Sequence, residues 1–332
     1  MRKEPLPNID LIKANIKRYV PYSYAVLRAI AQACFSVGAR NRSLDIYHDP
    51  NYLAYRFKGP TVITVHDLSW IRYPDTHPRE RIRAMDRYFP RSLERVSAII
   101  TDCEFVKNEL VEVFGVSPDM VHPAPLGVSS LFRPVSSEQA ASILMKHGFE
   151  FGKYFLSVGT LEPRKNITTI IDAFRRLRPE IQERYPLVLV GMRGWLTSSI
   201  DAKIQPLVEK GLVKVLGYVP DQQMPALYSG ATAFLFPSLY EGFGLPPLEA
   251  MACGTPVIVS NSSSLPEVVG DAGASFDPQD VEGITEAMSR ILDDAAWRES
   301  LSVMGVKRAA GFSWKRTAKE TIAVYRRVLN AQ

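Results

Sequence analysis

The sequence has little of what builds disulfide frameworks or metal clusters. Its three cysteines, Cys34, Cys103 and Cys253, lie far apart and show no metal-type spacing. An odd and scattered set of this kind is typical of free thiols in a reducing compartment. The 332 residues also contain no Asp-x-Asp triplet. We therefore expect an activity without a metal or other cofactor, in which basic residues take over a metal's task.

Long apolar runs are absent as well. The best candidate, residues 25–37, is interrupted by Arg28 and Gln32 and falls short of the ~20 apolar residues that span a membrane. The residues after Met1 lack the uninterrupted apolar core of a signal peptide. We therefore expect a cytoplasmic protein. The segment Lys13–Arg28 mixes basic and aromatic residues, which leaves open both a contact with the inner face of the cell membrane and an ordinary surface helix.

The charge is not extreme in either direction. A net charge of +5 suits anionic partners such as nucleotide diphosphates, a lipid-linked diphosphate acceptor or an acidic membrane surface. The basic residues are spread along the chain, and no nucleic-acid-binding module is recognisable. Nucleic acid is therefore not expected as a partner.

The length and the apolar pattern together predict two α/β halves. In the first half, buried strands are predicted at Thr61–Val65 and Ala98–Thr101, with an arginine-rich helix over 78–96 between them. In the second half strands and helices alternate, which predicts a parallel sheet wrapped on both faces. Its strands are expected at 154–158, 187–190, 213–216, 232–236 and 256–259, and its helices at 167–177, 200–209, 224–229 and 247–252.

Two further segments complete this organisation. Residues 132–138 lack clear periodicity and look like a linker. A last helix is predicted over 314–329. Its apolar residues share a single helical face: Trp314, Ala318, Ile322, Tyr325 and Leu329.

The segment from Ser238 to Glu249 carries the strongest functional pattern. It follows an apolar run that predicts a buried strand, and it leads through two glycines and a double proline into a helix. Glu241 therefore lies at the carboxyl end of a strand, in a loop whose amides can approach a ligand. Glu249 is expected in the first helical turn, where the helix dipole favours anions. Such a loop suits a phosphorylated, hydroxyl-rich ligand, whereas an acid that merely caps the helix is the plainer interpretation.

Arg164 and Lys165 form a second candidate cluster, directly before a helix that is predicted to begin near Asn166 as its N-cap. Cations at a helix N-terminus oppose the macrodipole by about 0.3–1 kcal/mol each. We therefore expect an anion between them, although two side chains that extend into water would explain the pattern too. Function in open α/β sheets lies beyond the carboxyl ends of the strands. Further candidates fall there: Gly159, Thr160, Gly191, Gly217, Tyr218 and Val219.

Four segments together resemble the retaining glycosyltransferases of the GT-B fold, in particular the bacterial mannosyltransferase-like branch of family 4. The two glutamates eight apart in the sequence YEGFGLPPLEAMACGTPV are similar to that family's donor-site signature. The sequence SVGTLEPRKN, residues 157–166, is similar to its diphosphate-binding loop. The other two segments are Val65-His66-Asp67 and LPEVVG, residues 265–270. The resemblance runs from about Ile46 to the C-terminus, with the order and spacing of the motifs preserved.

The resemblance implies an α/β fold of the GT-B class, with two Rossmann-like doubly wound domains and a cleft between them. It implies an N-terminal, acceptor-side domain at 1–135, a nucleotide-sugar-binding domain at 136–312, and a C-terminal helix at 313–332 that packs back on the first domain. Family members normally begin with a strand and a glycine-rich loop, but the first 45 residues here hold a single glycine, Gly38. We therefore expect the first domain to be incomplete or rebuilt, and donor binding to survive better than transfer activity.

The resemblance also implies roles for individual residues. Arg164 and Lys165 would hold the donor's diphosphate and stabilise the departing nucleotide, Glu249 would bind the ribose hydroxyls, and Glu241 the sugar ring. His66 would contact the donor sugar or shape the acceptor site. The expected catalytic residues are His66, Arg164, Lys165 and Glu241. The expected substrate-binding residues are Asp67, Gly159, Thr160, Gly191, Gly217, Tyr218, Val219, Gly242, Phe243, Gly244, Leu245 and Glu249. Weaker candidates, which a purely structural role would also explain, are Glu267, His48 and Asp277.

The implied activity is the transfer of a hexose from a nucleotide-diphosphate sugar to a lipid-linked or surface polysaccharide acceptor, with retention of configuration. Mannose is the first guess for the sugar, and GDP-mannose for the donor. In the resembled family the leaving phosphate helps to deprotonate the acceptor, so no protein nucleophile is expected. Two alternatives stay open: a non-catalytic subunit that binds nucleotide sugars, and a GT-B sugar-nucleotide epimerase.

Overall fold

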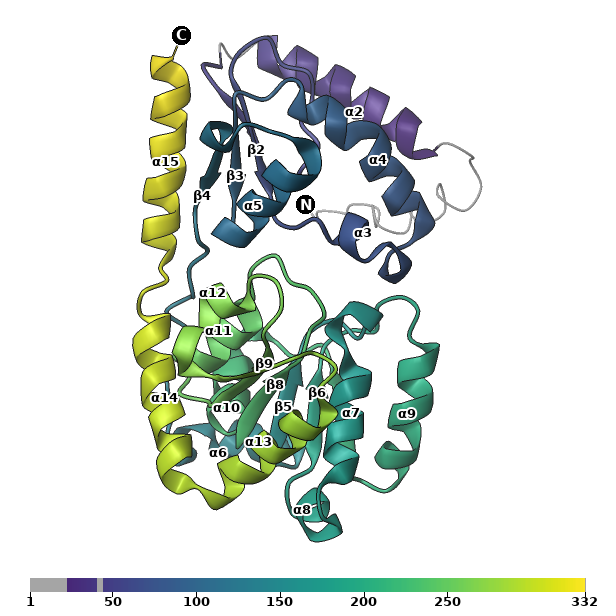
Figure 1. Cartoon of the computed structure of the whole chain (residues 1–332), viewed down its shortest axis with the longest axis vertical. Helices are drawn as coiled ribbons and strands as arrows, with labels where there is room; N and C mark the ends of the chain where they lie inside the picture. The colour runs from purple at the N-terminus through teal and green to yellow at the C-terminus, as the bar shows by residue number, and fades with distance from the viewer. Residues whose placement is uncertain (1–22, 41–43, 332) are drawn as a thin grey trace, which may run out of the picture.

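The computed structural model describes residues 23–40 and 44–331. Two α/β bodies follow one another along the long axis of the molecule (Figure 1). The N-terminal body holds a four-stranded sheet in the order β1-β2-β3-β4, and the C-terminal body holds a six-stranded sheet in the order β10-β9-β8-β5-β6-β7. Neighbouring strands are parallel in both sheets.

Helices separate the successive strands of the N-terminal body, except the first two. Its strands are β1 (Tyr47–Asp49), β2 (Thr61–Val65), β3 (Ala98–Thr101) and β4 (Val121–Pro123). Its helices are α2 (Ser23–Arg40), α3 (Ser69–Arg72), α4 (Arg79–Leu93) and α5 (Glu104–Phe114), with short 3₁₀ turns η1 (Pro74–Thr76) and η2 (Pro118–Met120).

The C-terminal body repeats the alternation on a larger scale. Its strands are β5 (Phe155–Val158), β6 (Leu187–Val190), β7 (Val213–Gly217), β8 (Ala233–Phe236), β9 (Val257–Ser260) and β10 (Ala274–Phe276). Its helices are α6 (Ser137–His147), α7 (Ile167–Arg176), α8 (Pro179–Arg184), α9 (Ser198–Glu209), α10 (Met224–Ser229), α11 (Leu245–Ala252), α12 (Leu265–Val269), α13 (Val281–Asp293) and α14 (Ala295–Ala309). Its 3₁₀ turns are η3 (Pro163–Lys165), η4 (Asp221–Gln223) and η5 (Gly270–Ala272).

The path of the chain through the C-terminal sheet locates its ligand-binding edge. The chain enters in the middle at β5 and builds outward through β6 and β7, then returns to β8 beside β5 and builds outward on the other side. The strand order therefore reverses between β5 and β8, and open α/β sheets bind ligands beyond the carboxyl ends of the strands at such a point. The loop with Arg164 and Lys165 follows β5, and the loop with Glu241 follows β8.

Two apolar layers enclose the C-terminal sheet. On one face, side chains of β5 and β6 pack with α7, α9 and α13. On the other face, α6, α10, α11, α12 and α14 contribute to a core that continues into the N-terminal body, where it includes residues of α4 and α5. One continuous apolar cluster therefore joins the two bodies.

The last helix, α15 (Trp314–Asn330), lies along the N-terminal body (Figure 1). Its buried residues Val324 and Val328 pack with Val62, Ala98 and Ile100 of β2 and β3. The helix therefore covers the face of the four-stranded sheet that α4 and α5 leave open.

The apolar face predicted for this helix is wrong. Trp314, Ile322 and Leu329 are 48%, 46% and 37% exposed, whereas Val324 and Val328 are 6% and 7% exposed. At ~3.6 residues per turn, the buried pair lies about a quarter turn away from the predicted face. Of the five residues of the predicted face, Tyr325 packs against the same cluster and is partly buried.

The strand and helix bounds follow the predictions closely elsewhere. The strands at 61–65, 98–101 and 187–190 have the predicted bounds, and the arginine-rich helix is shorter than predicted, at Arg79–Leu93. The linker prediction for 132–138 is wrong in its last two residues, which begin α6. There Ser136 Oγ accepts from the Gln139 amide and Gln139 Oε1 accepts from the Ser136 amide, a capping box that starts the helix. Of the segment Lys13–Arg28, residues 13–22 lie outside the described residues.

Candidate functional site

Three charged side chains meet where the strand order of the C-terminal sheet reverses. Arg164 and Lys165 lie in η3 after β5, and Glu241 lies in the loop after β8. Lys165 Nζ is 2.6 Å from Glu241 Oε1, and Arg164 Nη1 is 3.2 Å from Glu241 Oε2. Arg164 also donates to Glu162 Oε1 at 2.8 Å and to the Tyr240 carbonyl at 2.6 Å. The anion between the two cations is thus the Glu241 carboxylate in this structure.

The three side chains are mostly withdrawn from water, with 13%, 13% and 10% of the Arg164, Lys165 and Glu241 side chains exposed. Burial alone would raise the pKa of Glu241, but Lys165 and Arg164 outweigh it and hold the pKa below its ordinary value. Arg164 Nε is buried and has no hydrogen-bond partner among the described residues. The cluster therefore keeps a guanidinium donor that its own carboxylates do not satisfy.

Asn166 occupies the N-cap position of α7, as predicted, but its side chain does not cap the helix. Its Nδ2 donates instead to the carbonyls of Pro237 and Pro278, at 3.0 Å and 2.6 Å. Its backbone is in the left-handed region at φ 55°, which asparagine tolerates better than most residues. Asn166 thus fastens the turn that carries the two cations to the end of β8.

The loop that follows Glu241 is held by two serines. Ser263 Oγ accepts from the Glu241 amide at 2.8 Å, and Ser264 Oγ donates to the carbonyls of Glu241 and Phe243 at 2.9 Å and 2.7 Å. In the part of the chain that the structure describes, the amides of residues 242–244 have no acceptor. Amides at the start of a helix that lack acceptors bind anions readily, and here they precede α11, which begins at Leu245.

A cavity of about 310 Å³ opens at the carboxyl ends of β5, β6 and β7. It brings together several of the predicted substrate-binding residues: Gly159, Thr160, Gly191, Gly217, Tyr218, Val219 and Glu249. It also includes residues that the sequence analysis did not select: Phe132, Val158, Val190, Met192, Asp221 and Met224. Three of these, Val158, Val190 and Met192, are apolar residues within or near predicted strands and look like core residues in the sequence.

Gly191 is required at the floor of this cavity. A Cβ at this position would lie 1.9 Å from the Gly159 carbonyl oxygen, and its φ is +144°. The absence of a side chain therefore lets the ends of β5 and β6 come together and leaves the space above them open.

Glu249 closes one side of the cavity. It is the fifth residue of α11, so the prediction that it lies in the first helical turn is wrong: the helix begins two residues earlier than predicted, at Leu245. The Tyr228 hydroxyl donates to Glu249 Oε2 at 2.9 Å. Burial raises the pKa of Glu249 to about 7, with the Tyr228 hydrogen bond opposing the rise and Asp221 adding to it. This carboxylate therefore titrates near neutral pH.

His66 follows β2 in the N-terminal body and faces the loop that carries Glu241 from the N-terminal side. Its Nδ1 is 2.8 Å from Asp102 Oδ2, and its Nε2 is 2.9 Å from the Pro50 carbonyl oxygen. Both partners are acceptors, so both ring nitrogens donate when the imidazole is protonated, and the hydrogen bond to Asp102 raises the pKa of His66. Asp102 was not among the predicted site residues, although it directly follows β3 at the same edge as His66.

The two bodies touch at Gly242. A Cβ at this position would lie 1.9 Å from the His66 carbonyl oxygen, so no other residue fits without movement. Phe243 is buried and packs edge-to-face on Phe312, with 5.8 Å between ring centroids. Asp67 makes its hydrogen bonds locally, since its Oδ1 accepts from the Ser69 amide and hydroxyl at 3.0 Å and 2.8 Å. Its negative charge still acts on the cluster, because, against the effect of burial, it helps to raise the pKa of Arg164 together with Glu241 and Glu162.

The three weaker candidates make structural contacts. His48 joins the N-terminal sheet to α15, with its Nδ1 2.6 Å from the Tyr325 hydroxyl and its Nε2 2.9 Å from Thr64 Oγ1. Asp277 accepts from the Gln279 amide at 2.8 Å. Glu267 contacts the N-terminal body at the start of α5, where its carboxylate accepts from two backbone amides.

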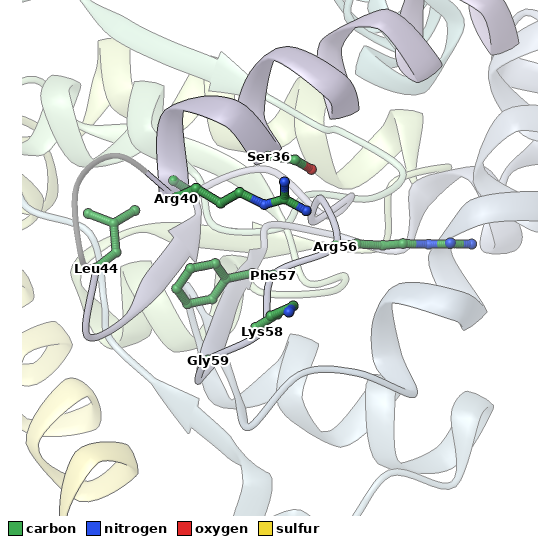
Figure 2. A pocket seen from close by; sticks show the side chains of 8 residues that line it. Ser36, Arg40, Leu44, Arg56, Phe57, Lys58 and Gly59 are labelled. Carbon is green, nitrogen blue, oxygen red and sulfur yellow. The ribbon is translucent and has the colours of Figure 1, made fainter.

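Two other cavities lie in the N-terminal body. One, of about 680 Å³, lies at the carboxyl end of β1 and beside α4, and it is lined in part by Arg28, Asp49, Asn51, Tyr55 and Glu80. Figure 2 shows the other, of about 490 Å³, between the end of α2 and residues 56–59. Residues 56–59 of its lining come just before β2, whereas His66 comes just after it. The second cavity is therefore at the opposite end of this strand from His66.

Within the described residues, no group of three or more His, Cys, Asp or Glu side chains is placed to hold a metal ion. Among the helices that the structure describes, none combines the length and apolar character needed to cross a membrane.

Two family models and several known proteins match the chain. The family model described as Glycosyltransferase Family 4 matches residues 6–130, and the one described as Glycosyl transferases group 1 matches residues 144–308. The chain is similar to an O-antigen chain mannosyltransferase B from Escherichia coli, with 41% identity over 282 residues, which cover 85% of this chain and 74% of the relative. It is also 34% identical to a serotype-specific mannosyltransferase, WbdA, from Escherichia coli over 72% of this chain, but it spans only 30% of that longer protein.

Among solved structures, a sucrose-phosphate synthase from Thermosynechococcus elongatus superimposes with a TM-score of 0.75 at 24% identity, over 91% of this chain and 78% of the other. This likeness confirms the predicted fold class, α/β of the GT-B type with two Rossmann-like domains.

Proposed function

This chain belongs to the family 4 glycosyltransferases, and on that premise we propose that it transfers mannose from a nucleotide-diphosphate sugar to a polysaccharide acceptor. We propose GDP-mannose as the donor, a lipid-linked or oligosaccharide chain as the acceptor, and retention of the anomeric configuration. The mannosyltransferase names of the relatives support the sugar. One observation carries the proposal: two cations, a buried glutamate and a set of unsatisfied amides meet beside a cavity whose far side holds a second glutamate.

The donor fits this arrangement in extended form. The base and ribose would occupy the 310 Å³ cavity, with Glu249 accepting from the ribose hydroxyls. The diphosphate would lie against Arg164, Lys165 and the amides of residues 242–244, which are all donors suited to phosphate oxygens. When the phosphates take over the two cations, Glu241 becomes free to accept hydrogen bonds from the sugar.

In the proposed reaction, the bond between the anomeric carbon and the oxygen of the distal phosphate breaks. A bond forms between the same carbon and an acceptor hydroxyl oxygen, on the face from which the phosphate leaves, and the hydroxyl proton passes to the leaving phosphate. Negative charge grows on that phosphate as the bond breaks. Arg164 and Lys165 are positioned to stabilise it, which is the form of catalysis that contributes most in many enzymes. No protein nucleophile takes part.

The acceptor would bind in the N-terminal body, in the 680 Å³ cavity at the carboxyl end of β1. Its lining offers what sugars bind: carboxylates from Asp49 and Glu80, the Asn51 amide and the Tyr55 ring. It is next to His66, because Pro50, whose carbonyl accepts from His66, follows Asp49 directly. A saccharide held there would reach the donor sugar across the contact between His66 and Gly242.

We also propose that no metal is required. Transfer should then proceed unchanged after treatment with EDTA. A loss of activity on chelation that added Mg²⁺ or Mn²⁺ restores would overturn this part of the proposal, since two protein cations would then be insufficient for the leaving diphosphate.

The function is tested in two steps. In the first, thermal shift is measured with GDP-, UDP- and ADP-sugars, because a ligand at 100 times its dissociation constant stabilises a protein by about 2.7 kcal/mol. In the second, the donor that binds is incubated with mannose-containing oligosaccharides, and the product is identified by mass spectrometry, with its linkage configuration measured by NMR. We expect stabilisation by GDP-mannose and one added hexose in the α-configuration.

Two results would contradict the proposal. Donor binding without transfer to any oligosaccharide or lipid-linked acceptor would favour a non-catalytic subunit. A change of the donor sugar itself, with no acceptor consumed, would favour an epimerase.

A further inference from the structure

The loop that carries Glu241 is tied to the N-terminal body by its neighbour, Tyr240. The Tyr240 hydroxyl donates to the Glu109 carboxylate of α5 and accepts from the Leu68 amide at 3.0 Å. Tyr240 is 3% exposed and Glu109 is 5% exposed. Arg72 Nε lies 2.7 Å from Glu109 Oε1 and balances its charge. A polar network of the N-terminal body is thus completed by a residue of the C-terminal body.

A second contact of this kind occurs at the start of α5. The N-cap residue of this helix, Cys103, makes no side-chain capping hydrogen bond. Glu267 of α12, in the C-terminal body, provides this cap. Glu267 Oε1 accepts from the Glu104 amide at 3.0 Å, and Glu267 Oε2 accepts from the Phe105 amide at 3.1 Å. In the described part of the chain, the Glu267 carboxylate has no other partner. It therefore caps a helix that it can reach only when the two bodies meet.

Both contacts involve one helix, α5, and lie beside the loop that carries Glu241. Glu109 lies in the middle of α5 and Glu267 binds its first turn. Next to them, the Cys103 thiol lies 3.0 Å from the Gly242 carbonyl oxygen. Tyr240 and Gly242 are the neighbours of Glu241 in the chain, so contacts of α5 fix the loop on both sides of the glutamate that pairs with Arg164 and Lys165.

We propose that Tyr240 and Glu267 are positioning residues that hold the two bodies closed and thereby place Glu241 and the amides of residues 242–244 for transfer. Neither residue touches the donor cavity, whose lining includes neither of them. Removing either should therefore impair turnover much more than donor binding. The proposal rests on the proposed transferase function for its kinetic part, and on the structure alone for its conformational part.

Two variants and two matched controls test the proposal. Tyr240→Phe removes the hydroxyl that joins the bodies, and Tyr154→Phe is its control, because the Tyr154 hydroxyl donates to Leu227 within the C-terminal body at 2.6 Å. Glu267→Ala removes the cap that the C-terminal body provides for α5. Asp294→Ala is its control, because Asp294 caps α14 within one body by accepting from the Trp297 amide at 2.9 Å.

The variants are compared by turnover with GDP-mannose, by GDP affinity from calorimetry, and by radius of gyration from X-ray scattering. We expect Tyr240→Phe and Glu267→Ala to lose about tenfold to a hundredfold in kcat, the range that a displacement of ~1 Å can cause. Their GDP affinity should fall much less than kcat, because Arg164, Lys165 and Glu249 keep their places in the C-terminal body. Their radius of gyration should rise above that of the wild type. The two controls should lose thermal stability while keeping kcat and the wild-type radius.

Three results would overturn the proposal. If both variants keep the wild-type turnover, the contacts of Tyr240 and Glu267 only stabilise the fold. GDP affinity that falls as steeply as kcat would place their effect in the donor cavity. An unchanged radius of gyration would mean that they do not hold the bodies together. If the wild type itself transfers no sugar, the proposed function fails, and the scattering comparison still decides the conformational claim.

Discussion

At the scale of single residues, the site balances two cations against one buried carboxylate. Glu241 is 7% exposed and lies within 2.6 Å of Lys165 and 3.2 Å of Arg164. A buried carboxylate needs such partners, since removing one side of a buried pair leaves an uncompensated charge. The same cations are the groups that a diphosphate would bind. In the proposed function, donor binding would therefore compete with the internal ion pair for the same atoms.

This competition gives the first prediction. Arg164→Ala combined with Lys165→Ala should lower kcat by about 10²–10³-fold or more, because the growing charge of the leaving group loses its stabilisation. It should also lower the free energy of unfolding by about 3–5 kcal/mol, because Glu241 stays buried without a partner. Turnover is measured with saturating GDP-mannose and stability by urea denaturation.

The triple variant that adds Glu241→Gln separates the two effects. It should recover much of the stability, because a neutral amide replaces the unpaired charge, but none of the turnover. A double variant whose Michaelis constant rises while kcat stays intact would show that the cations bind the donor without stabilising its departure.

The second prediction concerns Glu249, whose pKa burial raises to about 7. A carboxylate accepts from ribose hydroxyls best when ionised, so GDP affinity should rise with pH through about 7. At pH 8, Glu249→Gln should weaken GDP binding by about 1.5–3 kcal/mol, the range of a charge-assisted hydrogen bond. Calorimetry at several pH values measures both effects.

The stability of the protein should follow the opposite course. The pKa of Glu249 is higher in the folded protein than its ordinary value of 4.5, so the folded state binds more protons than the unfolded state between the two values. The contribution of this residue is therefore present at acid pH and is lost as pH rises through about 7. Glu249→Gln should show neither the rise of GDP affinity with pH nor the loss of stability with pH. The ionisation of GDP itself affects both proteins equally, so it cancels in the comparison. Equal pH profiles for the two would exclude Glu249 from the ribose site.

At the scale of elements, the sequence predicted best where one signal dominated. The fully buried strands β2, β3 and β6 have the predicted bounds, because runs of Val, Ile and Leu bounded by turns have few other interpretations. The prediction for α15 was wrong because two apolar faces overlap on it. One holds the large side chains, Trp314 and Ile322, and the other the smaller Val324 and Val328. Periodicity does not show which of the two meets the sheet.

The third prediction uses this contrast. Val324→Ala should lower the free energy of unfolding by about 1–2 kcal/mol, because it empties a buried contact with β2 and β3. Ile322→Ala, which removes a larger side chain from a position that is 46% exposed, should change stability by no more than about 0.5 kcal/mol. Urea denaturation of both variants measures the difference. A larger loss from Ile322→Ala would mean that the face predicted from the sequence is the one that packs.

For the candidate site, the sequence predicted which loops carry the site residues, but it did not predict which side chains contact one another. The rule that ligands bind beyond the carboxyl ends of strands selected Gly159, Arg164 and Glu241, and the topology places them around the reversal between β5 and β8. The pairing of Asp102 with His66 and of Glu267 with α5 joins residues 36 and about 163 positions apart. Such pairings depend on how elements and bodies pack, which the local pattern of a single sequence does not encode.

At the scale of the whole molecule, the two bodies divide the proposed work unequally. The donor cavity is lined by residues of the C-terminal body and by Phe132, just before it. The candidate acceptor cavity belongs to the N-terminal body. The two are joined by the contacts of α5 and by the approach of Gly242 to the His66 carbonyl. In the proposed function, binding of the nucleotide would therefore need one body, whereas transfer would need both.

The last prediction follows from this division. A fragment of residues 130–312, which keeps Phe132, Arg164, Lys165 and Glu249, should bind GDP more weakly than the whole chain but measurably, and should transfer no sugar. Its affinity should fall further with Glu249→Gln, as in the whole chain, because the ribose contact lies within the fragment. Circular dichroism establishes that the fragment is folded, and calorimetry then measures GDP binding. A folded fragment with no affinity for any nucleoside diphosphate would mean that the N-terminal body supplies part of the donor site, and that Tyr240 and Gly242 need their contacts with α5 before the amides of the loop can bind a phosphate.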